Sequence, residues 1–487
     1  MTFFLTFSKL SAISNSICMT DSVADATKAI DDLSLSAPAA PKQPFQRDSR
    51  PHLNIVFCGH VDAGKSTCSG HILFLTGNVD ERTMDKNKRE AVRKHRDGWE
   101  FAYVMDVTED ERDRGKTHEM GSAYFETQQK RYTILDAPGH RCFVSSMIGG
   151  ASQADIAILV ISSRRGEFET GFEGNGQTRE HALLLRTCGV GHLIVAINKL
   201  DDPSVNWSGE RYAEIKAKLI PFLKTIGFVD GRNCVFMPIS GITGQGLKDP
   251  VPAEFVGSFY KGPSLLGYLD GLANVKRSVD PNVRFPVQGA YKDDGKLTVY
   301  GKLESGEITK GDRLLVMPSK REMVVDSLLL GEFLVDAAEP GDFLHIKFRQ
   351  SEEEEVHPGY VLCKPSLPLK AVHYFQAQIM VSDKPLVSNG YVCMLHLHNA
   401  ECEVVLDRIL AKVDKRTNKV LAKDPGFARN GESVIVRMKT IAQPVVVELY
   451  KDFEKLGRLN LREEGKTIAF GVVTKIYENQ TGQASAQ

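Results

Sequence analysis

The segment GHVDAGKST, at positions 59–67, constrains this chain of 487 residues more than any other feature. It follows the apolar run LNIVFCG and opens a segment with helical spacing, which is the context that the pattern GxxxxGK[ST] needs to form a phosphate-binding loop. Glycines at 59 and 64 let the backbone curl until its N–H groups face phosphate oxygens, and the helix dipole adds to the attraction. The predicted phosphate-binding residues are Gly59, His60, Val61, Asp62, Ala63, Gly64, Lys65, Ser66 and Thr67.

Two side chains of this loop have separate expected roles. Lys65 would place its ammonium group against the β- and γ-phosphates, and the hydroxyl of Ser66 would bind Mg²⁺. The pattern predicts a phosphate site but says little about the base.

Apolar runs and helical segments alternate after this loop. Runs of mostly branched or aromatic residues occur in RYTILDAPG, ADIAILVISS, HLIVAINKLD and CVFMPIS, with charged segments such as 180–187 and 210–222 between them. This alternation predicts a mostly parallel sheet with helices on both faces, and such sheets bind ligands at the carboxyl ends of their strands. We assign residues 51–278 to this α/β domain.

The pattern changes after about residue 273. Short alternating strands are separated by turn signals such as KDDGK, AEPGD, SNGY and ARNGES. They predict two compact antiparallel β-barrels, at residues 279–370 and 371–480, followed by a disordered C-terminus at 481–487. The acidic run at 352–355 is interpreted as a solvated loop.

The first 50 residues differ in composition from the rest. Residues 21–50 mix Asp, Ser, Ala and Lys with three prolines, and such a segment buries too little apolar surface to offset the entropy of ordering. We predict a disordered tail at 1–50, in which 33–41 is a plain linker rather than a docking motif. A targeting signal is disfavoured because the basic start, cleavage site and arginines are lacking, and Met19 is an alternative start.

Composition excludes several classes of protein. With 61 Lys plus Arg against 62 Asp plus Glu, the net charge is −1, so we expect no sequence-specific nucleic-acid binding. Nine cysteines occur without a CxxC pair, which favours reduced thiols in an intracellular protein. Since no stretch of 18 apolar residues exists, we expect a cytoplasmic protein without a membrane span.

The segment DAPGH, at 136–140, ends the second apolar run in a glycine turn. Asp136 could hold Mg²⁺ through a water molecule, as the second carboxylate arm of P-loop enzymes does. Gly139 could bring its N–H to the γ-phosphate, and His140, next to it, would lie within reach of an attacking water. Taken alone, a histidine is more often a structural or surface residue.

Two further segments point to the base. NKLD at 198–201 contributes Asn198, Lys199 and Asp201, whose carboxylate can accept the N1–H and the 2-amino group of guanine. Adenine has no N1–H, and a site built on such pairing discriminates by about 10⁴–10⁵. SGITG, which begins at 240, could turn backbone N–H groups toward the guanine O6 atom, with these expected contributors: Ser240, Gly241 and Ile242.

The segment RGKT, at 114–117, lies between the phosphate loop and Asp136. Thr117 could supply a second hydroxyl to Mg²⁺, held only while the γ-phosphate is present, as in the switch of GTPases. Taken alone, RGKT is an ordinary basic turn.

These motifs, followed by two barrels, resemble the translation-factor GTPases over residues 53 to about 477. Segments such as ERDRGKTHEMGSAYFET, RGEFETGFEGNGQTREHA, INKLDDPSVNWS and GRLNLREEGKTIAFG resemble the branch formed by GTP-binding subunits of eukaryotic peptide chain release factors. Lys116 stands where elongation and rescue factors tend to have an apolar residue. The chain departs from the family at His118, Met120 and Ser122, where Val, Val and Arg are preferred.

The resemblance implies a GTPase of translation termination with GTP or GDP and Mg²⁺ as ligands. It implies a class I release factor and the ribosome as partners, with His140 positioning the attacking water. Poly(A)-binding protein is a weak expectation, because the tail lacks the long docking regions of some members. The alternatives are a factor that delivers aminoacyl-tRNA, a ribosome-rescue GTPase, and a scaffold that senses GTP without hydrolysing it.

The resemblance also points to 457–471 as the segment that holds the class I factor. Arg458 and Arg462 alternate with apolar neighbours, so period 2 places both guanidinium groups on one face of a strand. Two such groups suit the recognition of carboxylates. The alternative to partner binding is an ordinary barrel strand whose charged side chains are solvated.

Overall fold

The structure is a computed structural model that describes residues 50–96, 98–106, 121–140, 143–173, 176–275, 277–278, 280–293, 295–331, 333–349, 356–415 and 417–477. The segment Asp48–Gln487 forms one compact unit. Several predictions fall outside the described residues: those on the tail up to residue 49, on RGKT with Thr117, on His118 and Met120, on the acidic run, and on the C-terminus. No described helix has the length and apolar character needed to cross a membrane.

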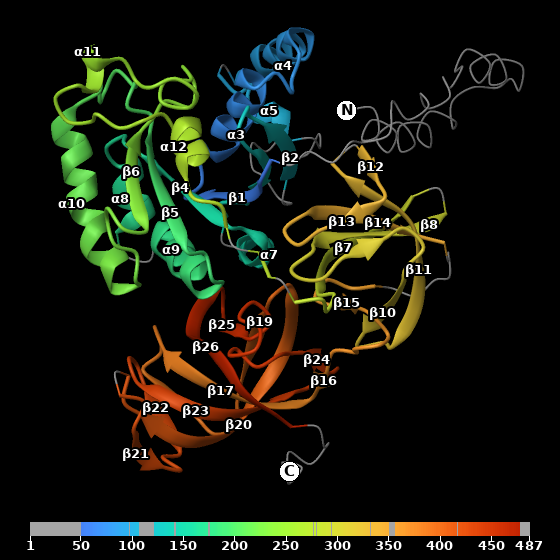
Figure 1. Cartoon of the computed structure of the whole chain (residues 1–487). Coiled ribbons are helices and arrows are strands. Elements are labelled where there is room, and N and C mark those ends of the chain that lie inside the picture. Colours follow the sequence, from blue (N-terminus) through green and yellow to red (C-terminus); the bar gives the residue numbers. More distant parts are fainter. Residues whose placement is uncertain are drawn as a thin grey trace, which may run out of the picture. The chain divides into compact units, whose positions relative to one another are not determined.

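The α/β domain is built on a six-stranded sheet (Figure 1). Its strands are β1 (His52–Gly59), β2 (Gly121–Glu126), β3 (Arg131–Asp136), β4 (Ile156–Ser162), β5 (His192–Asn198) and β6 (Cys234–Pro238). Their order is β2-β3-β1-β4-β5-β6, and all neighbours are parallel except β2 and β3. All five apolar runs are therefore strands of a mostly parallel sheet, as predicted.

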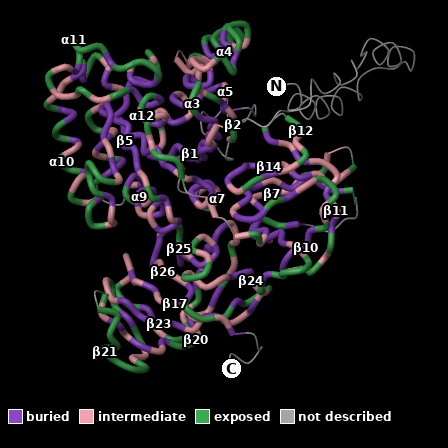
Figure 2. Tube along the Cα trace, in the orientation of Figure 1, coloured by how far each residue is buried: buried purple, intermediate pink, exposed green. Residues whose placement is uncertain are grey.

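Helices pack on both faces of this sheet. Those described are α3 (Lys65–Leu75), α4 (Glu81–Arg93), α5 (Ala102–Met105), α7 (Val144–Gln153), α8 (Glu167–Phe172), α9 (Gln177–Thr187), α10 (Gly209–Thr225), α11 (Ala253–Val256) and α12 (Leu265–Gly271). Side chains alternate along a strand, so Val56 and Cys58 pack in one core with α7, α9 and α10. Ile55 and Phe57 pack in the other core with α3, α4 and α12. Figure 2 shows the buried strands between the helices.

The first β-barrel follows the α/β domain. Its strands are β7 (Phe285–Asp293), β8 (Lys296–Lys302), β10 (Arg313–Met317), β11 (Arg321–Leu330), β14 (Phe343–Phe348) and β15 (Val361–Cys363). The order β10-β15-β7-β8-β14-β11 closes because β10 also pairs with β11. Three short strands are attached: β12 (Phe333–Val335) on β11, and the pair β9 (Ile308–Thr309) and β13 (Ala337–Ala338).

The second barrel closes in the same way. Its strands are β17 (Tyr374–Val381), β19 (Tyr391–Leu397), β20 (Ala400–Val413), β23 (Ser433–Thr440), β25 (Arg458–Glu463) and β26 (Lys466–Tyr477), joined by the pairing of β19 with β20. The accessory strands are β16 (Ala371–Val372), β18 (Leu386–Ser388), β21 (Val420–Lys423), β22 (Phe427–Arg429) and β24 (Val445–Val446). The predicted fold class, an α/β domain followed by two antiparallel barrels, is confirmed.

A buried carboxylate links the α/β domain to the first barrel. Asp155, which follows α7, accepts hydrogen bonds from the backbone N–H of Asn54 in β1 (2.9 Å), from Arg277 (2.7 Å) and from Lys302 in β8 (2.8 Å). Burial alone would raise the pKa of Asp155, but Lys302 and Arg277 outweigh it and hold the pKa well below its usual range.

Candidate nucleotide-binding site

The phosphate loop joins β1 to α3 through two glycines that no other residue could replace. Gly59 and Gly64 have φ values of 140° and 97°, in the left-handed region. A Cβ atom at Gly59 would lie 2.3 Å from the carbonyl oxygen of Val160, and one at Gly64 would lie 2.3 Å from Nδ2 of Asn198. The loop therefore packs its backbone directly on the neighbouring strands and leaves its other side for a ligand.

Lys65 begins α3 and is almost fully buried. Its Nζ donates a hydrogen bond to the carbonyl oxygen of His60, 2.9 Å away, across the loop. Burial lowers the pKa of Lys65, and the nearby carboxylate of Asp136 counteracts that effect. A Cβ atom on Gly139 would lie 2.5 Å from Nζ of Lys65 and 3.1 Å from the backbone N of Val61. The ammonium, the loop amides and the Gly139 backbone thus surround one small space that admits no extra side-chain atom.

The DAPGH segment reaches this space from the neighbouring strand. Asp136 is the last residue of β3 and is fully buried, and it pairs in register with Phe57 of β1. His140 follows four residues later, is partly exposed, and has its ring centroid 6.1 Å from that of Phe143. Because β1 and β3 are parallel neighbours, their carboxyl ends bring Asp136 and His140 beside the phosphate loop.

Asn198 ties three of the predicted motifs together. Its Nδ2 donates to the carbonyl oxygen of Ala63 in the phosphate loop (2.9 Å), and its Oδ1 accepts from the backbone N–H of Gly241 (2.8 Å). Asp201 follows in the same segment, and its carboxylate makes no hydrogen bond to any other described residue. Both of its oxygens can therefore face a base.

The structure changes one detail of the predicted base site. The N–H of Gly241 is taken by Asn198, and that of Thr243 donates to Oγ of Ser240. The N–H of Ser240 itself donates to the carbonyl oxygen of Gln245. Among Ser240, Gly241 and Ile242, only the N–H of Ile242 makes no hydrogen bond to another described residue, so it is the N–H of this group that remains available to a ligand in the pocket.

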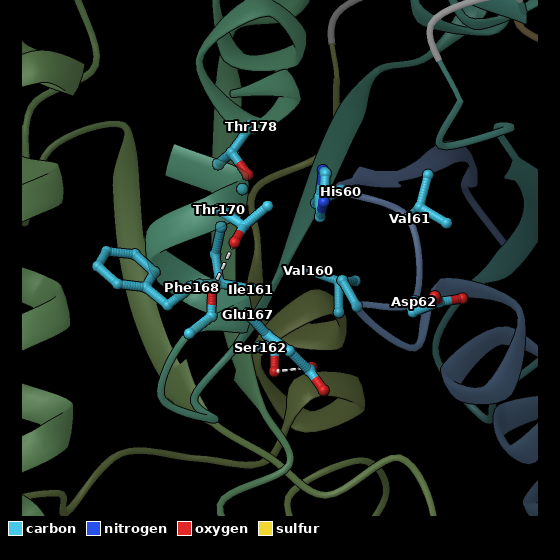
Figure 3. A pocket seen from close by; sticks show the side chains of 13 residues that line it. His60, Val61, Asp62, Val160, Ile161, Ser162, Glu167, Phe168, Thr170 and Thr178 are labelled. Carbon is cyan, nitrogen blue, oxygen red and sulfur yellow. Dashed lines mark hydrogen bonds between the residues drawn. The ribbon is translucent and has the colours of Figure 1, made fainter. Parts of the chain in front are cut away.

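One pocket of about 470 Å³ brings these motifs together, and this volume falls within the about 300–1,000 Å³ of small-molecule and cofactor sites. Predicted residues that line it are Val61, Asp62, Gly64, Lys65, Ser66, Thr67, Gly139, His140, Asn198, Lys199, Asp201, Gly241 and Ile242. His60 and Ala63 line a smaller neighbouring pocket of about 240 Å³, shown in Figure 3. The larger pocket fits a nucleoside phosphate, with a tight basic cradle at Lys65 and an open carboxylate at Asp201.

Several lining residues escaped the sequence analysis: Gly98, Trp99, Ala102, Asp106, Arg164, Glu167 and Asp202. They belong to no short motif, and the charged turn that carries Arg164 and Glu167 looks like a solvated loop in the sequence. Only its position between two parallel strands, at their carboxyl ends, could have indicated a role.

Arg458 and Arg462 share one face of β25, as predicted, and this face lies against α9. Arg462 is 4% exposed and its Nη1 contacts Oε1 of Glu180 in α9 at 2.6 Å. Arg458 is more accessible, and its Nη2 contacts the hydroxyl of Tyr450 at 3.0 Å. Arg462 is therefore not open to solvent, and binding of a partner by this pair stays a prediction.

Comparison with known families agrees with this arrangement. The model of the Elongation factor Tu GTP binding domain matches residues 50–323, more than half of the chain. The chain belongs to this family. A second model, the GTP-eEF1A C-terminal domain-like family, matches residues 374–474 in the second barrel.

Individual curated proteins also resemble this member of the elongation factor Tu GTP-binding family. The eukaryotic peptide chain release factor GTP-binding subunit of Candida maltosa is 49% identical over 429 residues, which cover 88% of this chain and 60% of that protein. The chain thus spans about 60% of the length of the curated relative.

Two solved structures complete the comparison. The Ski7 GTPase-like domain of S. cerevisiae, bound to GDP and inorganic phosphate, is 18% identical with a TM-score of 0.71, covering 87% of this chain and 97% of that one. Its likeness concerns the fold alone. The crystal structure of sup35 complexed with GDP is 40% identical with a TM-score of 0.40, covering 92% of this chain and 98% of that one.

Proposed function

We propose that this chain is a GTPase of translation termination. It would bind a class I release factor and couple ribosome-stimulated GTP hydrolysis to release of the finished peptide at a stop codon. The identity of 49% to a release factor GTP-binding subunit supports the choice of termination. Such a factor works in the cytoplasm, where the ribosomes are.

The observation that carries the GTPase assignment is the bridge made by Asn198. A single amide holds the phosphate loop at Ala63 and the base-side turn at Gly241, within one pocket that also contains Asp201. One ligand with a phosphate end and a guanine end satisfies both sides of this bridge. A phosphate site alone would need no such connection to the base loop.

The residues of the chain divide the work between binding and hydrolysis. The loop amides and Lys65 would hold the β- and γ-phosphates of GTP, and Asp201 would accept the N1–H and 2-amino hydrogens of guanine. His140 would orient a water molecule for in-line attack, in which the water oxygen bonds to the γ-phosphorus and the bond to GDP breaks. Positioning is the main catalytic contribution, so turnover without the ribosome should be slow.

The phosphate-binding loop and its surroundings offer oxygen ligands of the kind that Mg²⁺ prefers. The residues proposed to hold it are the hydroxyl groups of Ser66 and Thr117 and, through water, the carboxylate of Asp136. When bound, Mg²⁺ would neutralise negative charge on the phosphates.

A turnover assay tests the function directly. GTP hydrolysis is measured with the chain alone, with ribosomes, with a class I release factor, and with both. We expect strong stimulation only with both partners. Equal stimulation of hydrolysis by ribosomes with aminoacyl-tRNA would favour a factor that delivers aminoacyl-tRNA. Binding of GTP without turnover in any mixture would favour a scaffold that senses GTP without hydrolysing it.

The partner surface needs a variant that does not disturb the α/β domain. The double change of Arg458 and Arg462 to Ala would weaken class I factor binding, but Arg462 also contacts Glu180 within the chain. Arg458→Ala is the cleaner test, because the hydrogen bonds of Arg458 stay within the second barrel, at Tyr450 and Glu454, and its guanidinium only packs against Gly189, just after α9. Titration calorimetry with the class I factor should show weaker binding at unchanged GTP affinity; an unchanged affinity for the factor would return Arg458 to a structural role.

Poly(A)-binding protein remains a weaker proposal that rests on the tail.

A further inference from the structure

We call residues 198–202, which include Asp201, the base-reading segment. Side chains from the turn after β4 and the start of α8 hold this segment on both sides of Asp201. Lys199, two residues before Asp201, contacts Oε2 of Glu167 through its Nζ at 2.7 Å. Asp202, the residue after it, accepts a hydrogen bond from Nε of Arg164 at 2.5 Å. Arg164 lies in the turn after β4 and Glu167 is the first residue of α8, both more than 30 residues before the segment they hold.

Glu167 is the centre of this arrangement. Its Oε2 also accepts the hydroxyl of Ser162 at 2.7 Å, which Figure 3 shows as a dashed line beside the phosphate loop. Its Oε1 accepts from Nη1 of Arg164 at 3.3 Å. We call Ser162, Arg164 and Glu167 the loop clamp. Since Ser162 pairs in register with Asn198, the clamp is anchored on the strand next to the segment it holds.

The charge states agree with this geometry. Burial alone would raise the pKa of Glu167, but its hydrogen bonds with Lys199 and Ser162 outweigh burial and lower the pKa. The carboxylate is therefore ionised at neutral pH and pairs with a cation on either side.

The loop clamp contributes little to the stability of the fold. The side chains of Arg164 and Glu167 are 42% and 39% exposed, and ion pairs at such exposure contribute only about 0–1 kcal/mol. Their position is more telling, because Arg164, Glu167, Lys199, Asp201 and Asp202 all line the nucleotide pocket. Lys199 also adopts φ 63°, a left-handed conformation that a lysine does not favour by itself.

We propose that Glu167 is a positioning residue that fixes the base-reading segment and so sets how well Asp201 selects guanine. This inference rests on the proposed function, since it takes Asp201 as the guanine contact. Held at Lys199 and Asp202, the backbone between them keeps the Asp201 carboxylate in place for two hydrogen bonds at once. Without the clamp the phosphate loop would still bind the phosphates, but the base-reading segment would hold Asp201 less precisely at the base.

The test compares two nucleotides that differ only at the 2-amino group. Affinities of the full chain for GDP and for IDP, whose base lacks that group, are measured by titration calorimetry. The wild-type chain should prefer GDP by about 10- to 100-fold, the value of one hydrogen bond to a charged group. Glu167→Gln, which keeps the shape and removes the charge, should reduce this preference by about threefold or more.

Glu169→Gln is the matched control. Glu169 lies on the same helix, is similarly exposed, and pairs with Arg211 rather than with the base-reading segment. Its GDP-to-IDP preference should equal that of the wild-type chain. Arg164→Met provides a second, independent break of the clamp at Asp202 and should act like Glu167→Gln if the latter variant fails to fold.

The outcomes separate the two proposals. If the wild-type chain binds GDP and IDP equally, Asp201 does not read guanine and the proposed function fails together with the inference. If the wild-type chain discriminates but both clamp variants keep its preference, the inference is overturned and the proposed function stands. Equal losses for GDP and IDP would also overturn it, because they would assign the clamp to the fold rather than to the base.

Discussion

Asp201 offers the sharpest test at the scale of one residue. Its carboxylate accepts two hydrogens in our assignment, and Asn in its place would offer one acceptor and one donor. Xanthine has a carbonyl where guanine has its 2-amino group, so Asp201→Asn should shift the preference from GTP toward XTP by about two orders of magnitude. Competition binding with both nucleotides measures the shift. A variant that still strongly prefers GTP would show that NKLD does not read the base.

His140 separates binding from hydrolysis. It lines the pocket beside Gly139 but has no assigned contact with bound GTP in the ground state. We expect His140→Ala to keep GTP affinity and to lower ribosome-stimulated turnover by about 100-fold or more, because a misplaced water is a poor nucleophile. Single-turnover hydrolysis with ribosomes and class I factor gives the rate. Stimulated turnover at the wild-type rate would remove His140 from the mechanism.

At the scale of elements, α9 connects the phosphate loop to the second barrel. His181 accepts a hydrogen bond at Nδ1 from the backbone N–H of Gly59 (3.1 Å), and the preceding Glu180 contacts Arg462 and Thr467 of β25 and β26. One helix therefore touches both the start of the nucleotide site and a barrel. A displacement of β25 against α9 would therefore be transmitted to Gly59 through the consecutive residues Glu180 and His181.

Removing the cation of this contact should destabilise the chain measurably. Arg462→Met removes the positive charge from the buried side of the contact with the partly exposed Glu180, and we expect a loss of about 2 kcal/mol in the free energy of unfolding. Arg408→Met is the control, because the Arg408–Asp424 pair in the same barrel is more than half exposed and should contribute less than about 1 kcal/mol. Urea unfolding of both variants decides; equal losses would contradict the prediction.

At the scale of the whole molecule, buried histidines should make the chain sensitive to acid. Burial lowers the pKa of His181 and His396 to about 3 and that of His398 to about 4, against 6.5 for the free side chain. The unfolded chain therefore binds more protons than the folded one between pH 6.5 and 4, and stability falls as the pH drops through this window. Each histidine contributes a slope of up to about 1.4 kcal/mol per pH unit.

Urea midpoints at pH 7, 6 and 5 measure this effect. The midpoint should fall steadily, and His398→Gln should make the fall shallower, because the amide keeps a donor for the carbonyl oxygen of Val446 without a titrating ring. A midpoint that is constant from pH 7 to 5 would mean that these histidines take up protons without unfolding.

Much of this molecule could be predicted from its sequence, for physical reasons that differ between parts. The five parallel strands are buried on both faces and so are continuous apolar runs, whereas β2 has one fully buried residue and gave no such signal. The phosphate and base motifs were found because their chemistry needs fixed residue types at fixed spacing. The loop clamp was missed, since Glu167 meets Lys199 only after the sheet has folded. The common face of Arg458 and Arg462 followed from period 2, but no local pattern could show that α9 covers it.

The buried carboxylate at Asp155 bears on how the molecule can be divided for laboratory work. A recombinant fragment that ends before residue 277 would keep Asp155 and Asn54 but lose both Arg277 and Lys302. That fragment would carry an uncompensated acidic group on the surface that the barrel normally covers. Asp155→Asn would retain an acceptor for the backbone N–H of Asn54 without the charge, so this variant suits spectroscopy on the isolated α/β domain.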